Sequence, residues 1–147
     1  MRRGAAWEFE LERWHARYCS RQVAWVVKTE PATKLWEGRL LYESKGPPDF
    51  VGVLKGGRGV VFDAKHVPRF TFSCLEDHQG RDLELAHRLG ALSFVAVRSG
   101  ESRYVLPWAT ITDRYWRWRD GERRISVAES DRITMDDTGW YSWAEGQ

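Results

Sequence analysis

Residues 46–66 constrain the fold more than any other part of the chain, because they join two short apolar runs through a glycine-rich turn. The runs are 49–54 and 59–65, and the residues between them, 55–58, include two adjacent glycines. Glycine adopts positive φ without strain, which tight hairpin turns require. The stretch therefore predicts a β-hairpin, and the two prolines before it predict an extended approach to the first strand.

Alternation along the second strand of this hairpin divides its side chains between two faces. Phe62 and Ala64 share one face, whereas Asp63 and Lys65 share the other. Asp49 stands at the start of the partner strand, so strand pairing would bring it close to Asp63. We therefore expect two carboxylates and one ammonium group to converge at one end of the hairpin.

Such a cluster suits phosphodiester hydrolysis. Two carboxylates are hard oxygen ligands for Mg²⁺ or Mn²⁺, which also accept water and phosphate oxygens as ligands. A bound ion lowers the pKa of a water molecule and polarises the phosphorus centre. Lys65 could orient that water or neutralise charge growing on the phosphate. The structural alternative is a surface hairpin in which Asp63 and Lys65 form an ordinary ion pair.

The spacing of these residues also carries a resemblance. Pro48-Asp49 followed by Asp63-Ala64-Lys65 matches the pattern P-D-(x)n-(D/E)-x-K, and the chain resembles the PD-(D/E)xK nuclease superfamily. More narrowly, it resembles RecU-type Holliday junction resolvases from about residue 2 to residue 106. The supporting pieces are Arg3-Gly4 with Glu8, Lys28-x-x-Pro31-x-Thr33, Asp49-Phe50-x-Gly52-Val53-x-Lys55-Gly56, Phe62-Asp63-Ala64-Lys65 and Asp77-His78-Gln79. The second acid is an aspartate, where that family usually has glutamate.

The resemblance implies a fold and a set of catalytic residues. The fold is α/β, with a restriction-endonuclease-like core in which helices flank a central mixed β-sheet. The implied catalytic residues are Asp49, Asp63, Lys65, Gln79 and Glu8, and the implied metal ligands are Asp49, Asp63, Glu8 and the Ala64 carbonyl. By this resemblance Lys65 assists the attacking water and Gln79 positions it. Without the resemblance, the simpler interpretation is that Glu8 stabilises the N-terminal half of a helix through the helix dipole and that Gln79 is solvated.

The resemblance also implies a DNA substrate and a dimeric assembly. The residues expected to contact DNA are Arg2, Arg3, Lys28, Lys34, Lys45, His66 and Arg69. In RecU-like proteins, the segment that corresponds to residues 34–45 forms a stalk that projects into the DNA junction. Two symmetric cuts would suit a C₂ homodimer, whose axis can match that of a four-way junction. The structural alternatives are solvated basic residues and a surface histidine.

Hydrophobic periodicity predicts the remaining elements of the core. We expect helices over 4–20 and 74–89, the second capped by Ser73 in a capping box and ended by Gly90. We expect strands over 22–29, 91–98 and 102–106. Residues 35–43 fit either a strand or the arm of a projection.

Residues 107–147 change in character and predict an aromatic and basic extension packed on the core. Residues 115–119 alternate aromatic and arginine side chains, and we interpret them as a strand. Its tryptophans would complete the core or a dimer interface; alternatively, they would stack on unpaired bases while the arginines hold phosphates. We also expect an edge strand within 125–134, and Trp140 and Trp143 to anchor the tail.

Composition limits the class of protein. A chain of 147 residues with 42% hydrophobic residues predicts one globular domain over 1–147. A net charge of +2 means that DNA binding must depend on charge placement. Cys19 and Cys74 form no disulfide framework, and no signal peptide or membrane span is expected, so we predict the cytoplasm of a bacterium or phage-infected cell.

Three functions remain open at this point. The first is a Mg²⁺-dependent endonuclease that resolves Holliday junctions and, as in the superfamily, leaves 5′-phosphate ends. The second is a restriction or repair nuclease with the same core, because the cluster does not specify the substrate. The third is a DNA-binding module with an idle site, against which the intact Asp49, Asp63 and Lys65 argue.

Overall fold

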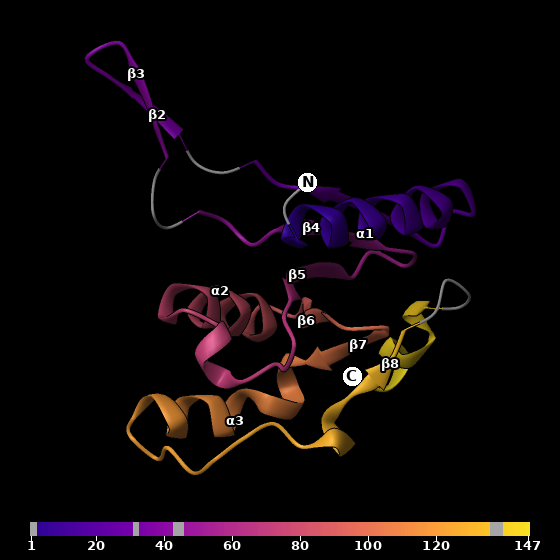
Figure 1. The fold of residues 1–147 in the computed structure, drawn as a ribbon. Coiled ribbons are helices and arrows are strands. Elements are labelled where there is room, and N and C mark those ends of the chain that lie inside the picture. Colours follow the sequence, from indigo (N-terminus) through magenta and orange to yellow (C-terminus); the bar gives the residue numbers. More distant parts are fainter. Residues whose placement is uncertain (1–2, 31–32, 43–45, 136–139) are drawn as a thin grey trace.

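The computed structural model describes residues 3–30, 33–42, 46–135 and 140–147. Most elements belong to one α/β body, shown in Figure 1. Their order is α1 (Arg3–Ser20), β1 (Ala24–Lys28), β2 (Thr33–Trp36), β3 (Arg39–Tyr42), β4 (Phe50–Leu54), β5 (Gly59–His66), the 3₁₀ helix η1 (Phe72–Cys74), α2 (Asp77–Arg88), β6 (Leu92–Ser99), β7 (Ser102–Pro107), α3 (Trp108–Arg119), the 3₁₀ helix η2 (Glu129–Asp131), β8 (Ile133–Thr134) and the 3₁₀ helix η3 (Trp140–Gly146). Within these ranges, no helix combines the length and the apolar character needed to cross a membrane.

Six strands form the central sheet in the order β1-β4-β5-β6-β7-β8. Only β5 and β6 pair in parallel; the other neighbours are antiparallel, so the sheet is mixed, as predicted. The β4–β5 turn contains Gly56 and Gly57 with φ of 97° and 98°, which confirms the glycine-rich hairpin. The strands β2 and β3 form a separate hairpin that extends away from the body (Figure 1), so residues 35–42 belong to a projecting arm, and residue 43 lies outside the described residues.

Helices cover both faces of this sheet and bury two clusters of apolar side chains. On one face, α1 and η3 pack over an aromatic ladder in which Phe62 stacks on Phe50 at 4.7 Å and on Phe94 at 4.5 Å between ring centroids. On the other face, α2 and α3 bury Leu83 and Trp108 against β6 and β7. The strand β5 is therefore fixed from both sides, which is what a rigid catalytic cluster requires.

The strand predicted over 115–119 is wrong, because these residues end the helix α3. Trp108, Ile111 and Tyr115 are fully buried and recur at helical spacing, so they form one apolar stripe against the sheet. A run of five residues is too short to distinguish the strand period of two from the helix period of 3.6. The helical period becomes apparent only when the apolar residues are followed from Trp108. The predicted edge strand within 125–134 is present as β8, which is only two residues long.

The second predicted helix starts later than its capping box suggested. Ser73 lies inside η1, and α2 begins at Asp77 after Glu76. The Glu76 N–H donates to Gln79 Oε1 at 3.0 Å, so the side chain of Gln79 caps the start of α2. The sequence instead predicted that Glu76 would cap a longer helix that starts after Ser73. The predicted end is confirmed, since Gly90 follows the helix with φ of 100°.

The C-terminal tail packs on the α1 face of the sheet. Trp143 meets Phe94 edge-on at 5.4 Å, so this tryptophan anchors the tail as predicted, whereas the side chain of Trp140 lies outside the described residues. His15 of α1 joins the tail more tightly: its Nε2 lies 2.8 Å from the Tyr141 hydroxyl, and its Nδ1 lies 2.7 Å from the Leu11 carbonyl. A carbonyl only accepts, so Nδ1 carries the proton and Nε2 accepts from Tyr141.

We expect His15 to make the fold sensitive to acid. Burial lowers the pKa of His15 to about 4, below its usual 6.5, so the folded protein keeps the ring neutral while the unfolded chain binds a proton. Relative to a His15→Gln variant, which is neutral at every pH, wild-type stability should fall by about 3 kcal/mol between pH 7 and pH 4. Urea denaturation of both proteins at pH 7, 5.5 and 4 measures this difference. Parallel pH curves for the two proteins would contradict it.

Candidate active site

Asp49 and Asp63 lock the start of β4 to the middle of β5. The Asp49 N–H donates to Asp63 Oδ1 at 3.1 Å, and the Ala64 N–H donates to Asp49 Oδ2 at 2.9 Å. The Thr29 N–H donates to the Asp49 carbonyl at 2.8 Å, which ties the same point to the end of β1. The two carboxylates therefore share one end of the sheet, where the sequence places them by strand pairing.

The carboxylate of Asp63 is buried beside a second negative charge. Only 1% of Asp63 is exposed, and within the described part of the chain nothing donates a hydrogen bond to its Oδ2. Burial, and then the nearby Asp49 carboxylate, raise the pKa of Asp63 to about 7. An unpartnered buried carboxylate oxygen of this kind is costly unless a cation or a proton occupies the site.

Lys65 extends toward α2 and meets Gln79. Its Nζ donates to Gln79 Oε1 at 3.2 Å, and the same oxygen accepts the Glu76 N–H. The helix start thus fixes the amide, and the amide holds the lysine. Lys65 also moderates the pKa rise at Asp63 through its positive charge, so it lies near the carboxylate pair.

A cavity of about 390 Å³ opens on this cluster. Glu8 of α1 lies on its wall and forms an ion pair of 3.5 Å with Lys28 of β1. The cavity is lined by Glu8, Lys28, Thr29, Glu30, Gly46, Pro47, Asp49, Lys65, Ser73, Cys74, Glu76, His78 and Gln79. Four of the five predicted catalytic residues therefore line one cavity, and the fifth, Asp63, is hydrogen-bonded to Asp49 beneath it.

The predicted DNA contacts are divided between this cavity and other places. Lys28 lines the cavity, whereas His66 and Arg69 do not. His66 follows Lys65 on β5 and points to the opposite face by strand alternation. Arg69 is exposed beyond the strand. The remaining predicted contacts lie outside the described residues: Arg2 and Lys45 entirely, and Arg3 and Lys34 in their side chains.

Sequence reasoning missed two cavity residues at the start of α2. Glu76 and His78 form an ion pair of 3.3 Å when the imidazole is protonated, and both line the cavity. The signal that could have revealed His78 is the run Asp77-His78-Gln79, where the family resemblance singled out only the glutamine, whereas Glu76 was assigned to the capping box with Ser73. The late start of α2 explains the omission, because a helix from Cys74 gives these side chains a different orientation.

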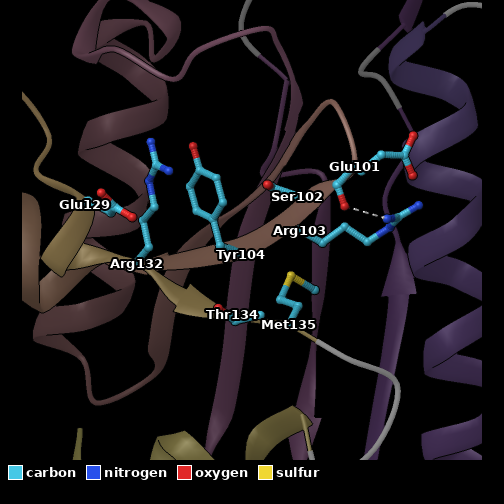
Figure 2. Close-up of a pocket in the computed structure, with 8 residues that line it drawn as sticks. All are labelled: Glu101, Ser102, Arg103, Tyr104, Glu129, Arg132, Thr134 and Met135. Carbon is cyan, nitrogen blue, oxygen red and sulfur yellow. Dashed lines mark hydrogen bonds between the residues drawn. The ribbon is translucent and has the colours of Figure 1, made fainter.

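A second cavity, of about 370 Å³, lies at the β7–β8 edge of the sheet (Figure 2). Arg132 covers the ring of Tyr104, with its Cζ 4.5 Å from the ring centroid. Arg103 donates to the Glu101 carbonyl at 3.1 Å and forms an ion pair with Glu10 of α1. This cavity lacks the carboxylate pair and the lysine that meet at the first one, so we place the candidate active site at Asp49 and Asp63.

The donor atoms at Asp49 and Asp63 fit a small hard cation. Among the described residues, no three His, Cys, Asp or Glu side chains gather into a complete metal cage. Two carboxylates supplemented by a backbone carbonyl and water are what Mg²⁺ prefers, since it retains several waters. Structural zinc sites need four protein ligands, mostly cysteine and histidine. The partnerless Asp63 Oδ2 is the atom that a bound cation would satisfy.

A mixed sheet with a carboxylate pair and a lysine at one end of a hairpin is the arrangement that the resemblance to the PD-(D/E)xK class implied. The family model "Recombination protein U", RecU, matches residues 2–136. The chain belongs to the RecU family of Holliday junction resolvases. The match continues beyond Leu106, where the motif resemblance ended, and so includes α3.

A solved structure supports the fold. The Holliday junction resolvase Hjc from the archaeal hyperthermophile Archaeoglobus fulgidus is similar over 89% of this chain and 95% of the Hjc chain, with a TM-score of 0.56 and 14% identity. Identity this low bears on the fold alone. A comparison with curated proteins gave no match.

Proposed function

We propose that this chain is a Mg²⁺-dependent endodeoxyribonuclease that resolves four-way DNA junctions by paired symmetric cuts, with Mn²⁺ as a possible substitute. The observation that carries the metal dependence is the partnerless, buried Asp63 Oδ2 beside the Asp49 carboxylate. Membership of the RecU family supports the junction as substrate.

In this proposal, Asp49 and Asp63 hold the cation, and the Ala64 carbonyl is a further neutral ligand. When bound, the ion supplies Lewis acidity toward the phosphate and lowers the pKa of a water molecule. Lys65 orients the attacking water or neutralises the developing phosphate charge through its Nζ. Glu8 is an additional partner of the metal or the water at the cavity wall, where it forms an ion pair with Lys28. In-line attack then leaves 5′-phosphate and 3′-hydroxyl ends.

Gln79 is a positioning residue for Lys65 in this scheme. We expect Gln79→Ala to reduce cleavage about tenfold, because the ammonium group loses the oxygen that now holds it 3.2 Å away. Gln79→Glu should retain more activity than Gln79→Ala, since a carboxylate can still accept from Lys65. Single-turnover cleavage of a labelled junction measures both rates, and junction binding should change by less than about twofold. Equal rates for wild type and Gln79→Ala would remove this role.

A homodimer would deliver the two cuts, and an apolar patch on β1 and β4 supports one. Trp25 is 55% exposed, and its cross-strand partner Val53 and neighbour Val27 are 36% and 39% exposed. The strand β1 is also an edge of the sheet. Exposed apolar side chains on an edge strand are typical of a surface that pairs with another chain, and a second copy would cover this patch while bringing a second active site.

Cleavage of branched DNA tests the proposal. Purified protein should cut a labelled four-way junction at symmetric positions with Mg²⁺, should not cut in EDTA, and should spare linear duplex. Sequence-specific cutting of linear duplex would indicate a restriction-type nuclease. Junction binding without any cutting, with Mg²⁺ or Mn²⁺, would contradict the enzymatic proposal.

A further inference from the structure

Arginines at the C-terminal end of α3 and in the residues that follow it are arranged around Trp118. Arg123 lies over the indole ring, with its Cζ 4.4 Å from the centroid, and Arg119 lies 5.7 Å from the same centroid. Arg119 Nε also donates to the Tyr115 hydroxyl at 3.2 Å. The aromatic rings therefore hold two guanidinium groups in defined positions close to each other.

These arginines differ in how their charge is balanced. Arg117 on the same helix forms ion pairs with Asp113 at 3.6 Å and Glu122 at 2.9 Å. Over the described ranges, by contrast, Arg119, Arg123 and Arg124 form no ion pair with a carboxylate. Like charges held together without a counter-charge repel one another, so the group favours an anion that approaches from solvent. Arg124 is exposed and follows Arg123 directly in the chain. We call Arg119, Arg123 and Arg124 the arginine cluster.

Hydrogen bonds connect the arginine cluster to the wall of the candidate active site. The Tyr115 hydroxyl that accepts from Arg119 lies 2.9 Å from the Leu75 carbonyl and 3.1 Å from the Glu76 carbonyl, to which it donates. Glu76 lines the cavity, and its N–H donates to the oxygen of Gln79 that holds Lys65. Four short contacts thus link Arg119 to the catalytic lysine.

Close packing of α3 on α2 keeps the arginine cluster in this place. Gly80 of α2 lies against the Tyr115 ring and leaves no room for a side chain there. Phe72 of η1 lies 6.3 Å from Trp118 between ring centroids, and its neighbours Ser73 and Cys74 line the cavity. In Figure 1, α3 runs alongside α2 on the same side of the sheet.

The contacts of Trp118 decide which part of a nucleic acid this surface takes. The indole packs against Tyr115 at 6.3 Å and an interplanar angle of 25°, and Arg123 covers it. An unpaired base would have to displace these neighbours to stack there. Arg123 and Arg124 are exposed to solvent, and guanidinium groups bind phosphate oxygens through paired N–H donors.

We propose that the arginine cluster is a phosphate clamp for the backbone of the duplex arm beside the cleavage position. This inference rests on the proposed function and adds a second contact area to it, on the α2–α3 face of the molecule. Within 115–119, Arg119 thus serves phosphate binding, with the rings of Tyr115 and Trp118 as its supports.

The test compares Arg123→Gln/Arg124→Gln with Arg117→Gln in junction binding. Fluorescence anisotropy with a labelled four-way junction in EDTA, at 50, 100 and 200 mM KCl, gives the affinity and its salt dependence. At 100 mM the double variant should bind about tenfold more weakly, and its log K against log[salt] slope should be smaller in magnitude by about 1 to 2. Arg117→Gln also removes a positive charge, from the end of α3 beside the arginine cluster, and should match wild type because Arg117 is already paired with Asp113 and Glu122.

Arg123→Lys/Arg124→Lys should recover part of the affinity, because lysine keeps the charge but loses paired donation. Affinity and slope equal to wild type in the glutamine variant would overturn the clamp. Weaker binding with an unchanged slope would also overturn it, since it would show a structural effect without a lost phosphate contact. Wild-type protein that neither binds nor cuts junctions would instead refute the proposed function, and the clamp with it.

Discussion

Asp63→Asn is expected to reduce junction cleavage by about 10³-fold or more while changing junction binding by less than about twofold. The substitution removes the negative charge that would hold the cation, yet it preserves the shape of the side chain. The amide oxygen can still accept the Asp49 N–H, which Asp63 Oδ1 now accepts at 3.1 Å. The buried hairpin end should therefore remain folded.

Single-turnover cleavage and anisotropy with the same labelled junction measure the two effects separately. Asp113→Asn is a suitable control, because Asp113 is an exposed acid on α3, remote from the cavity lining, and its loss changes the net charge equally. Full activity in Asp63→Asn would remove Asp63 from the site. Loss of binding as well as cleavage would show that the residue supports the fold rather than the chemistry.

Lys65→Ala is expected to slow cleavage by about 10²-fold with little change in junction binding. Its ammonium group is held by Gln79 next to the carboxylate pair, where it can act on the attacking water or the phosphate. Little binding energy should depend on it if its contact strengthens only in the transition state.

Lys55→Ala provides the matched control, since Lys55 is exposed at the β4–β5 turn, at the other end of the hairpin. The cleavage rate at saturating enzyme and the dissociation constant for the junction should be measured for both variants. If Lys65→Ala loses affinity in proportion to its rate, Lys65 is a phosphate clamp and the assignment to the chemical step is wrong.

Local patterns predicted the hairpin that carries the site. All the signals for this hairpin lie within about twenty residues: the glycine pair, the alternation of Phe62 and Asp63, and the position of Asp49. The pairing of the two strands therefore followed directly from the local sequence. The mixed sheet and the buried strand before the β6–β7 turn were likewise readable, because their apolar runs are bounded by clear turn residues.

Long-range packing decided the features that the sequence did not reveal. Residues 115–119 form a helix because Trp108, Ile111 and Tyr115 together cover the sheet, and that stripe is apparent only when the helix is followed from its first residue. The start of α2 depends on the hydrogen bond from the Glu76 N–H to the Gln79 side chain. From the sequence alone, a capping box formed by Ser73 and Glu76 was equally plausible. The link from Lys65 through α2 to Arg119 spans three elements and has no local signature.

The shared role of Asp49 and Asp63 in holding one divalent cation is tested most directly by anomalous diffraction from crystals soaked in Mn²⁺. We expect one strong anomalous peak about 2.1 Å from an oxygen of each carboxylate, on the side of Asp63 Oδ2. An anomalous peak elsewhere in the molecule, with none between these two carboxylates under conditions that support cleavage, would contradict it.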